Sequence, residues 1–294
     1  HQALEKLCDY AIARHYPEIS NTGNDRFILL LEKVAERQVK LVVEWLRVGF
    51  IHGVMNTDNT TISGETIDYG PCAMMGAYKP ETVFSSIDRN GRYAFGNQPT
   101  IAQWNMARFA ETLLPLNDQD EKQAIDKASK VIADFSTNLK KRYLQMMARK
   151  TGLTEYQPVD HELVSQLLEQ LEKKKLDYTI SFDLLTRSLS SESAENKIRA
   201  DLGNWHNAWK KRIENLPATN QETQALMRQA NPVLIPRNHH MENVIHTCIG
   251  TGEAGPAEDF IEALRSPYTD TKKTLQFQDA PDDADSGYRT FCGT

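Results

Sequence analysis

Helical periodicity constrains the fold of this chain more than any other feature of its sequence. Between Asn24 and Gly49, in the stretch "NDRFILLLEKVAERQVKLVVEWLRVG", apolar residues recur every three to four positions. This spacing places apolar side chains on one face of an α-helix and predicts an amphipathic helix packed on a core. Asn24 or Asp25 is expected to cap the start of the helix, and Gly49 is expected to end it.

The same periodicity continues through most of the chain beyond residue 100. A helix is predicted from Thr100, its expected cap, in "TIAQWNMARFAETLLPL". Long charged helices are predicted between Asp120 and Leu189, and further helices at "IRADLGNWHNAWKKRIENL", "NQETQALMRQA" and "MENVIHTCI". We interpret the charge runs as solvated helix faces, and Trp205 and Trp209 as packing residues. The predicted fold class is therefore mainly α.

Composition excludes several classes of function. The formal net charge of -6 over 294 residues gives no support for a nucleic-acid partner, which usually requires a basic stripe. No apolar run approaches the ~20 residues that span a bilayer, so no membrane association is expected. The four cysteines contain no CxxC pair, which argues against a zinc ribbon and indicates a reducing compartment. The chain starts at His1 without a methionine or a signal segment, which suggests a fragment or a processed product.

One stretch between the predicted helices is rich in β-forming residues instead. In "TDNTTISGETIDYG", five β-branched residues surround the turn-forming pair Ser63-Gly64, which predicts a β-hairpin. Asp58 and Asn59 precede this hairpin, and Asp68 follows it. An isolated hairpin is seldom stable in water, so we expect the helices to clamp it in place.

Two kinds of cation site could use these polar residues, an EF-hand and a kinase-like centre. An EF-hand fails on spacing, because Gly64 falls one position too late when Asp58 opens the loop. A kinase-like centre fits better, since it needs a carboxylate base, an asparagine and a second carboxylate as Mg²⁺ ligands, in the order His52, Asp58-Asn59, Asp68-Tyr69-Gly70. The base and the asparagine are adjacent here, and Gly53 replaces the usual arginine. On spacing alone, a purely structural turn remains an equal alternative.

Longer strings give the chain a specific resemblance. The segments "HGVMNTDN", "TIDYGP", "GRYAFGNQP", "WNMARFAETL" and "NPVLIPRNH" resemble the selenoprotein O family, and the similarity runs from the helix at Asn24 to "SPYTD" and the near-terminal cysteine. The resemblance implies a kinase-like fold that transfers AMP, rather than phosphate, from ATP to Ser, Thr or Tyr hydroxyls of protein substrates. It also implies that ATP binds in a flipped orientation and that pyrophosphate is released.

The resemblance also implies roles for individual residues. Asp58 matches the proposed base, while Asn59 and Asp68 match the ligands of Mg²⁺ or Mn²⁺, with Asp68 also lying against the nucleotide. Cys292 matches the near-terminal selenocysteine or cysteine, which implies a redox role and a redox partner. Some members pair it with a cysteine after Asp-Tyr-Gly, where this chain has Phe84; Cys72 could substitute if the two Cα atoms lie about 4.4–6.8 Å apart.

The resemblance divides the chain into three parts. Residues 1–118 correspond to a kinase-like C-lobe with the catalytic loop and hairpin, residues 119–272 to a helical extension, and residues 273–294 to a flexible tail. No Gly-rich phosphate cradle precedes His52, so we expect the nucleotide-binding N-lobe to be absent and this fragment alone to be inactive. The compartment implied is the bacterial cytoplasm, or the mitochondrion in a eukaryote.

Alternatives to this function remain open on the sequence. They are a kinase-like phosphotransferase and a non-catalytic interaction module gated by redox chemistry at Cys292. A separate metal set, His239, Glu242 and His246, shares one face of a predicted helix. We interpret it as a structural helix start, because no further ligand with motif spacing accompanies it.

Overall fold

The computed structural model describes residues 1–19, 23–118, 120–281, 285 and 287–291. Two short strands, β1 (Phe50–Ile51) and β2 (Ala73–Met74), form a small antiparallel pair. The rest of the regular structure is helical, which confirms the mainly α class. The helices are α1 (Gln2–His15), α2 (Arg26–Val48), α3 (Gln98–Asn117), α4 (Glu121–Lys150), α5 (Asp160–Lys173), α6 (Tyr178–Arg187), α7 (Glu192–Leu202), α8 (Asn204–Glu214), α9 (Asn220–Ala230), α10 (Asn238–Thr251), α11 (Gly255–Leu264) and α12 (Lys272–Leu275).

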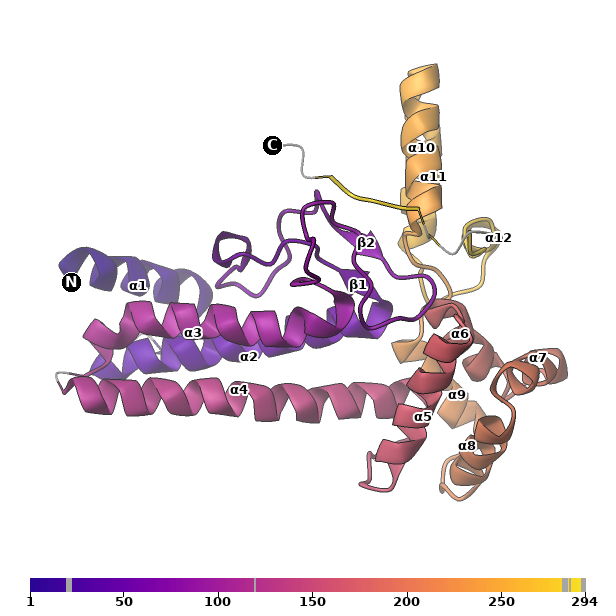
Figure 1. Cartoon of the computed structure of the whole chain (residues 1–294), viewed down its shortest axis with the longest axis horizontal. Helices are drawn as coiled ribbons and strands as arrows, with labels where there is room; N and C mark the ends of the chain where they lie inside the picture. Colours follow the sequence, from indigo (N-terminus) through magenta and orange to yellow (C-terminus); the bar gives the residue numbers. More distant parts are fainter. Residues whose placement is uncertain (20–22, 119, 282–284, 286, 292–294) are drawn as a thin grey trace.

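Helices α2, α3 and α4 pack against one another and form the layer on which the candidate site is built (Figure 1). The apolar face predicted for α2 is buried, from Phe27 to Leu46. Gly49 ends this helix as predicted, in a left-handed conformation (φ 79°) with its N–H bonded to the Trp45 carbonyl. Asp25 precedes the helix but its side chain makes no capping hydrogen bond.

The predicted boundary of α3 was wrong. The helix begins at Gln98 rather than at Thr100, because Pro99 lies in its first turn, where a missing N–H costs nothing. The long charged helix α4 begins after Asp120, whose carboxylate accepts from the backbone N–H groups of Lys122 and Gln123. The predicted helical stretch around Trp205 is interrupted at Gly203 (φ 55°), which separates α7 from α8.

The predicted hairpin around Ser63-Gly64 was also wrong. Residues 60–67 form no strand; instead, the Thr61 hydroxyl donates to the Glu65 carbonyl (2.7 Å) and accepts from the Glu65 N–H (2.9 Å). The Thr61 carbonyl accepts from the side-chain amide of Gln38 on α2 (2.6 Å). Local and helix side chains therefore satisfy backbone groups that a ladder would have used. The two-stranded pair lies outside this segment, between β1 and β2.

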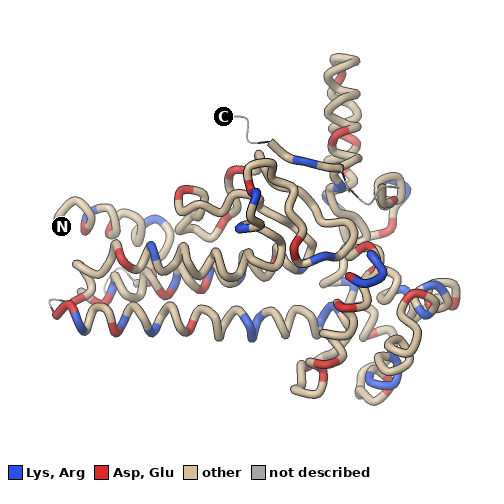
Figure 2. Tube along the Cα trace, in the orientation of Figure 1, with Lys and Arg blue, Asp and Glu red and all other residues tan. Residues whose placement is uncertain are grey.

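The remaining helices continue from the end of α4. Helices α5 to α9 gather there, and α10 projects away from the layer, with α11 packed beside it (Figure 1). Lysine and arginine alternate with acidic residues along the long helices, as expected for solvated faces (Figure 2). Within the described part of the chain, no helix has both the length and the apolar composition needed to cross a bilayer.

The start of α10 is tied to the start of α6 by a buried ion pair that predicts a large stability effect. Arg237 donates to both carboxylate oxygens of Asp177 (2.8 and 3.2 Å), and their side chains are only 4% and 12% exposed. Asp177 also caps α6 by accepting from the Ile180 N–H. We expect Asp177→Ala to lower the free energy of unfolding by about 3–5 kcal/mol, because it leaves a buried guanidinium unpaired.

The measurement is urea denaturation of the purified protein, with Asp134→Ala as the matched control. Asp134 pairs with Lys130 at the surface, where the side chains are 54% and 77% exposed. Loss of this pair should change the free energy of unfolding by less than about 1 kcal/mol. Equal effects of the two substitutions would contradict the account.

Candidate active site

His52 is a buried anchor for the segment that carries the predicted catalytic residues. Its backbone N–H donates to the Gln98 side chain (3.0 Å), and its Nε2 lies 2.9 Å from the Ile67 carbonyl. The Val54 N–H points at Nδ1 (3.4 Å), so Nδ1 is the acceptor and Nε2 carries the proton. Burial lowers the pKa of His52, although its bond to the Ile67 carbonyl opposes the shift. The imidazole is therefore neutral and fixes the residue immediately before Asp68.

Gly53 explains why no arginine follows this histidine. Its backbone is left-handed (φ 88°), and a Cβ placed there would lie 2.4 Å from the Pro71 carbonyl oxygen. The loop after β1 and the Asp-Tyr-Gly segment therefore approach each other too closely for any side chain. This close approach brings the two halves of the predicted site together.

Asn59 and Asp68, the two predicted metal ligands, are in direct contact. The Asn59 Nδ2 donates to Asp68 Oδ2 (2.6 Å) and to the Val54 carbonyl (3.1 Å). Because both partners are acceptors, the amide orientation is fixed and Asn59 Oδ1 is directed away from them. Asp68 itself adopts a left-handed backbone (φ 55°), an uncommon conformation for a non-glycine residue.

The donor atoms of this pair fit a hard divalent cation. Asn59 Oδ1 and Asp68 Oδ1 take part in no hydrogen bond among the described residues, and both are the oxygen type that Mg²⁺ prefers. Asp58, the predicted base, lies in the 3-10 turn Thr57–Asn59, next to Asn59, and its side chain is exposed. The three residues therefore present an amide oxygen and two carboxylates at an open surface.

Sequence reasoning missed the buried amides that hold this segment. Gln98 donates to the Phe50 carbonyl (3.0 Å) and accepts from the His52 N–H, and Asn105, also on α3, donates to the Met55 carbonyl (3.0 Å) and Thr60 Oγ1 (2.8 Å). Both side chains are at most 2% exposed. The predicted helix began at Thr100 and left Gln98 outside it, which hid the signal; in α3 the two amides lie seven residues apart and therefore on one face.

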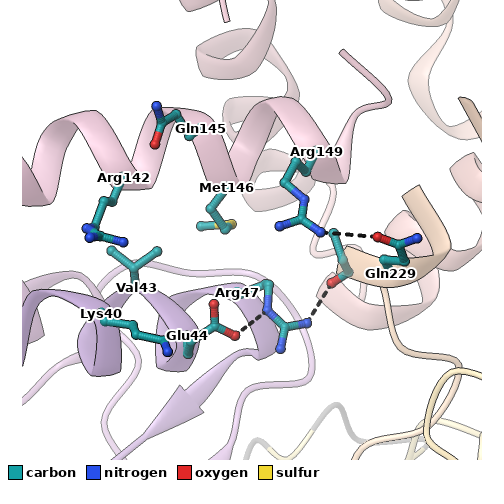
Figure 3. Close-up of a pocket in the computed structure, with 10 residues that line it drawn as sticks. Lys40, Val43, Glu44, Arg47, Arg142, Gln145, Met146, Arg149 and Gln229 are labelled. Carbon is teal, nitrogen blue, oxygen red and sulfur yellow. Dashed lines mark hydrogen bonds and ion pairs between the residues drawn. The ribbon is translucent and has the colours of Figure 1, made fainter. Parts of the chain in front are cut away.

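The three predicted residues line neither the apolar groove beside Tyr69 nor the basic pocket between α2 and α4. A groove of about 940 Å³ runs beside Tyr69 and is lined largely by apolar and aromatic side chains, including Trp45 and Phe50. A smaller pocket of about 230 Å³ lies between α2 and α4; Lys40, Arg47, Arg142 and Arg149 line it, and Glu44 pairs with Arg47 (Figure 3). Asp58, Asn59 and Asp68 lie outside both cavities.

The predicted redox site is only partly described. Cys292 lies outside the described residues, so its pairing with Cys72 is not tested. Burial raises the pKa of the Cys72 thiol to about 11, which keeps it protonated at neutral pH. Thr290, within the stretch interpreted as a tail, pairs with the backbone around Ser85. The Thr290 N–H donates to the Phe84 carbonyl, and the Thr290 carbonyl accepts from the Ser86 N–H, both at 2.9 Å.

The alternative candidates have structural explanations. Trp205 and Trp209 are buried and stacked with ring centroids 6.2 Å apart, which confirms their packing role. Glu242 accepts from the Tyr288 hydroxyl (3.1 Å), and His246 is exposed. In the described part of the chain, His239 is grouped with His240 and Asp279 rather than with Glu242 and His246.

The chain is similar to known proteins over most of its length. Residues 1–265 match the family described as "Protein adenylyltransferase SelO". A relative from Teredinibacter turnerae, named protein nucleotidyltransferase YdiU, is 52% identical over 293 residues, which is 99% of this chain and 60% of the relative. Relatives of the same name from Pseudoalteromonas translucida and Anoxybacillus flavithermus are 47% and 46% identical, over 99% and 100% of this chain and 60% of each relative.

These matches define the class of the protein. The chain belongs to the SelO family, whose sequence profile matches most of its length. The chain spans about 60% of the length of the curated relatives it matches.

The contact at Gly53 generates a stability prediction. We expect Gly53→Ala to lower the free energy of unfolding by at least about 2 kcal/mol, because it combines a left-handed backbone with a clash against Pro71. Urea denaturation measures the change. Gly250→Ala is the matched control: Gly250 lies within α10 with no atom within 4 Å of a built Cβ, so alanine should be neutral or stabilising there. A Gly53→Ala variant as stable as the control would disprove the close approach.

The lowered pKa of His52 predicts a pH dependence of stability. Above the unfolded pKa of about 6.5, both states are neutral and the stability is complete. As the pH falls below that value, the unfolded chain takes up a proton that the folded state excludes, and stability is lost. We expect His52→Gln to show a smaller loss between about pH 7.5 and about pH 5.5 in urea denaturation. An unchanged slope would show that the pKa of His52 is the same in the folded and the unfolded states.

Proposed function

We propose that the protein containing this chain transfers AMP from ATP to hydroxyl side chains of other proteins, with Mg²⁺ or Mn²⁺ as the cofactor. The observation that carries the proposal is the Asn59–Asp68 contact beside the exposed Asp58. Family membership supports it, as does the name protein nucleotidyltransferase given to the relatives. Because these relatives are bacterial, we propose the bacterial cytoplasm as the compartment.

The proposed reaction assigns one role to each polar residue. The substrate hydroxyl oxygen forms a bond to the α-phosphorus of ATP, the bond to the bridging oxygen breaks, and pyrophosphate leaves. Asp58, which is exposed and adjacent to Asn59, accepts the proton of the substrate hydroxyl. Asn59 and Asp68 hold the cation through their oxygens. When bound, that cation neutralises phosphate charge and orients the phosphates.

The buried residues act as positioning groups in this proposal. The neutral imidazole of His52 fixes the Ile67 carbonyl, and thereby the left-handed backbone of Asp68. Holding a ligand in one geometry before substrate binds reduces the ordering cost of the reaction. We propose that the other phosphates of ATP are bound by the part of the protein that corresponds to the relatives' sequence not covered by this chain.

The direct test uses the full-length protein with ATP labelled at either the α- or the γ-phosphate. We expect label transfer to protein from the α-position only. Asp68→Ala should slow the transfer at least about a hundredfold, or about 2.7 kcal/mol of transition-state stabilisation. Glu65→Gln is the control, because Glu65 is an exposed acid in the same segment whose side chain makes no hydrogen bond or ion pair in the described structure.

Two results would contradict the proposal. Transfer of the γ-label would identify a phosphotransferase instead. Unchanged α-label transfer in Asp68→Ala would show that the Asn59–Asp68 pair does not hold the nucleotide's cation.

A further inference from the structure

Three side chains that can ligate a metal converge at the base of α10, apart from the candidate active site. His239 and His240 lie in the first turn of this helix, and Asp279 follows α12. The Nε2 of His240 lies 2.9 Å from Asp279 Oδ1, and the Nε2 of His239 lies 3.5 Å from Asp279 Oδ2. One possible ligand atom from each residue lies within 4.8 Å of the other two. Consecutive helix residues normally diverge by about 100°, so this convergence is unusual.

The nitrogen atoms of His239 are left without partners. Both Nδ1 and Nε2 are shielded from solvent and make no hydrogen bond. The 3.5 Å separation from Asp279 is too long for one. Buried polar atoms without partners are costly and are rare in native proteins. An ion between the two rings and the carboxylate would give one of the two His239 nitrogens a partner, whereas in its absence Asp279 hydrogen-bonds only to His240.

The surroundings hold this cluster in place. The rings of Phe260 and Phe277 flank His240, with centroids 6.4 and 5.3 Å from the imidazole. Asn238, the residue before His239, exchanges two hydrogen bonds of 2.9 Å with the backbone of Met74 on β2. The start of α10 is therefore fixed to the core strands, which reduces the cost of assembling a ligand set.

The local charges permit a cation. The positive charge of Arg237, two residues before His239, is neutralised by its bidentate pair with Asp177. The positive end of the α10 dipole opposes a cation at this position, and the Asp279 carboxylate offsets it. The two imidazole rings, whose centroids lie 4.0 Å apart, would repel each other if both were protonated. Two neutral imidazoles with one carboxylate form a donor set with a net charge of minus one.

We propose that His239, His240 and Asp279 bind a borderline divalent cation of the Zn²⁺ type, which joins the start of α10 to the segment after α12. Two imidazole nitrogens and one carboxylate suit Zn²⁺, and they suit Mg²⁺ poorly because Mg²⁺ prefers oxygen ligands. Three protein ligands leave a fourth position for water. This site is chemically distinct from the oxygen-only pair at Asn59 and Asp68.

The test measures metal binding rather than activity, and therefore does not depend on the proposed transferase reaction. The full-length protein without a histidine tag is stripped of metal and equilibrated with Zn²⁺ in excess Mg²⁺. The zinc bound per protein molecule is then measured by inductively coupled plasma mass spectrometry. We expect His239→Ala and Asp279→Asn each to weaken zinc binding at least about tenfold. Asp279 is exposed, so its variant is not expected to unfold.

A matched control separates this site from other zinc-binding groups. His246→Ala removes an exposed histidine from the same helix and should leave binding unchanged. Substitution of Co²⁺ for Zn²⁺ gives a second readout, since its visible spectrum reports nitrogen ligation and should be lost in His239→Ala. The proposal is overturned if wild type binds no more zinc than the His239→Ala/His240→Ala double variant, or if His246→Ala weakens binding equally. In either case Asp279 serves only as a hydrogen-bond partner of His240.

Discussion

The side-chain amide of Gln98 bridges the two backbone groups on either side of Ile51, accepting from the His52 N–H and donating to the Phe50 carbonyl. Both groups lie where β1 ends, and a buried backbone group without a partner would cost about 1–3 kcal/mol. This single amide therefore ties α3 to the start of the segment that carries Asp58 and Asn59. The neutral ring of His52 then extends the connection to Ile67, immediately before Asp68.

Beyond this contact, the candidate site is held together by close contacts between two loop segments rather than by regular secondary structure. Gly53 allows the loop to contact the Pro71 backbone, and Asn59 bonds directly to Asp68. A segment without a hydrogen-bonded ladder can hold such geometry only when helix side chains satisfy its backbone. Asn105 on α3 does this at the Met55 carbonyl. The exposed polar residues thus rest on a buried polar framework that belongs to the helices.

The sequence allowed helices such as α2 and α5 to be predicted, because each buries an apolar face with its own local period. Helices α1, α11 and α12 were not predicted. The sequence also predicted that Asn59 and Asp68 belong to one site, because their order along the chain matches that of a kinase-like centre. It could not predict how residues 60–67 fold, since Thr61 closes that turn with its hydroxyl instead of a strand ladder. The cluster at His239 was beyond prediction for a different reason: Asp279 lies 39 residues from His240, and only the packing of α10 against the segment after α12 brings them together.

The proposed function requires Asn59 and Asp68 to hold one cation between them in the folded protein. Its most direct test is a titration of Mn²⁺ into the full-length protein with ATP, in which bound Mn²⁺ is counted by electron paramagnetic resonance. The account predicts that Asn59→Ala and Asp68→Asn each weaken Mn²⁺ binding by at least about tenfold, while Glu65→Gln binds as wild type. Mn²⁺ binding that is the same in all four proteins would contradict it.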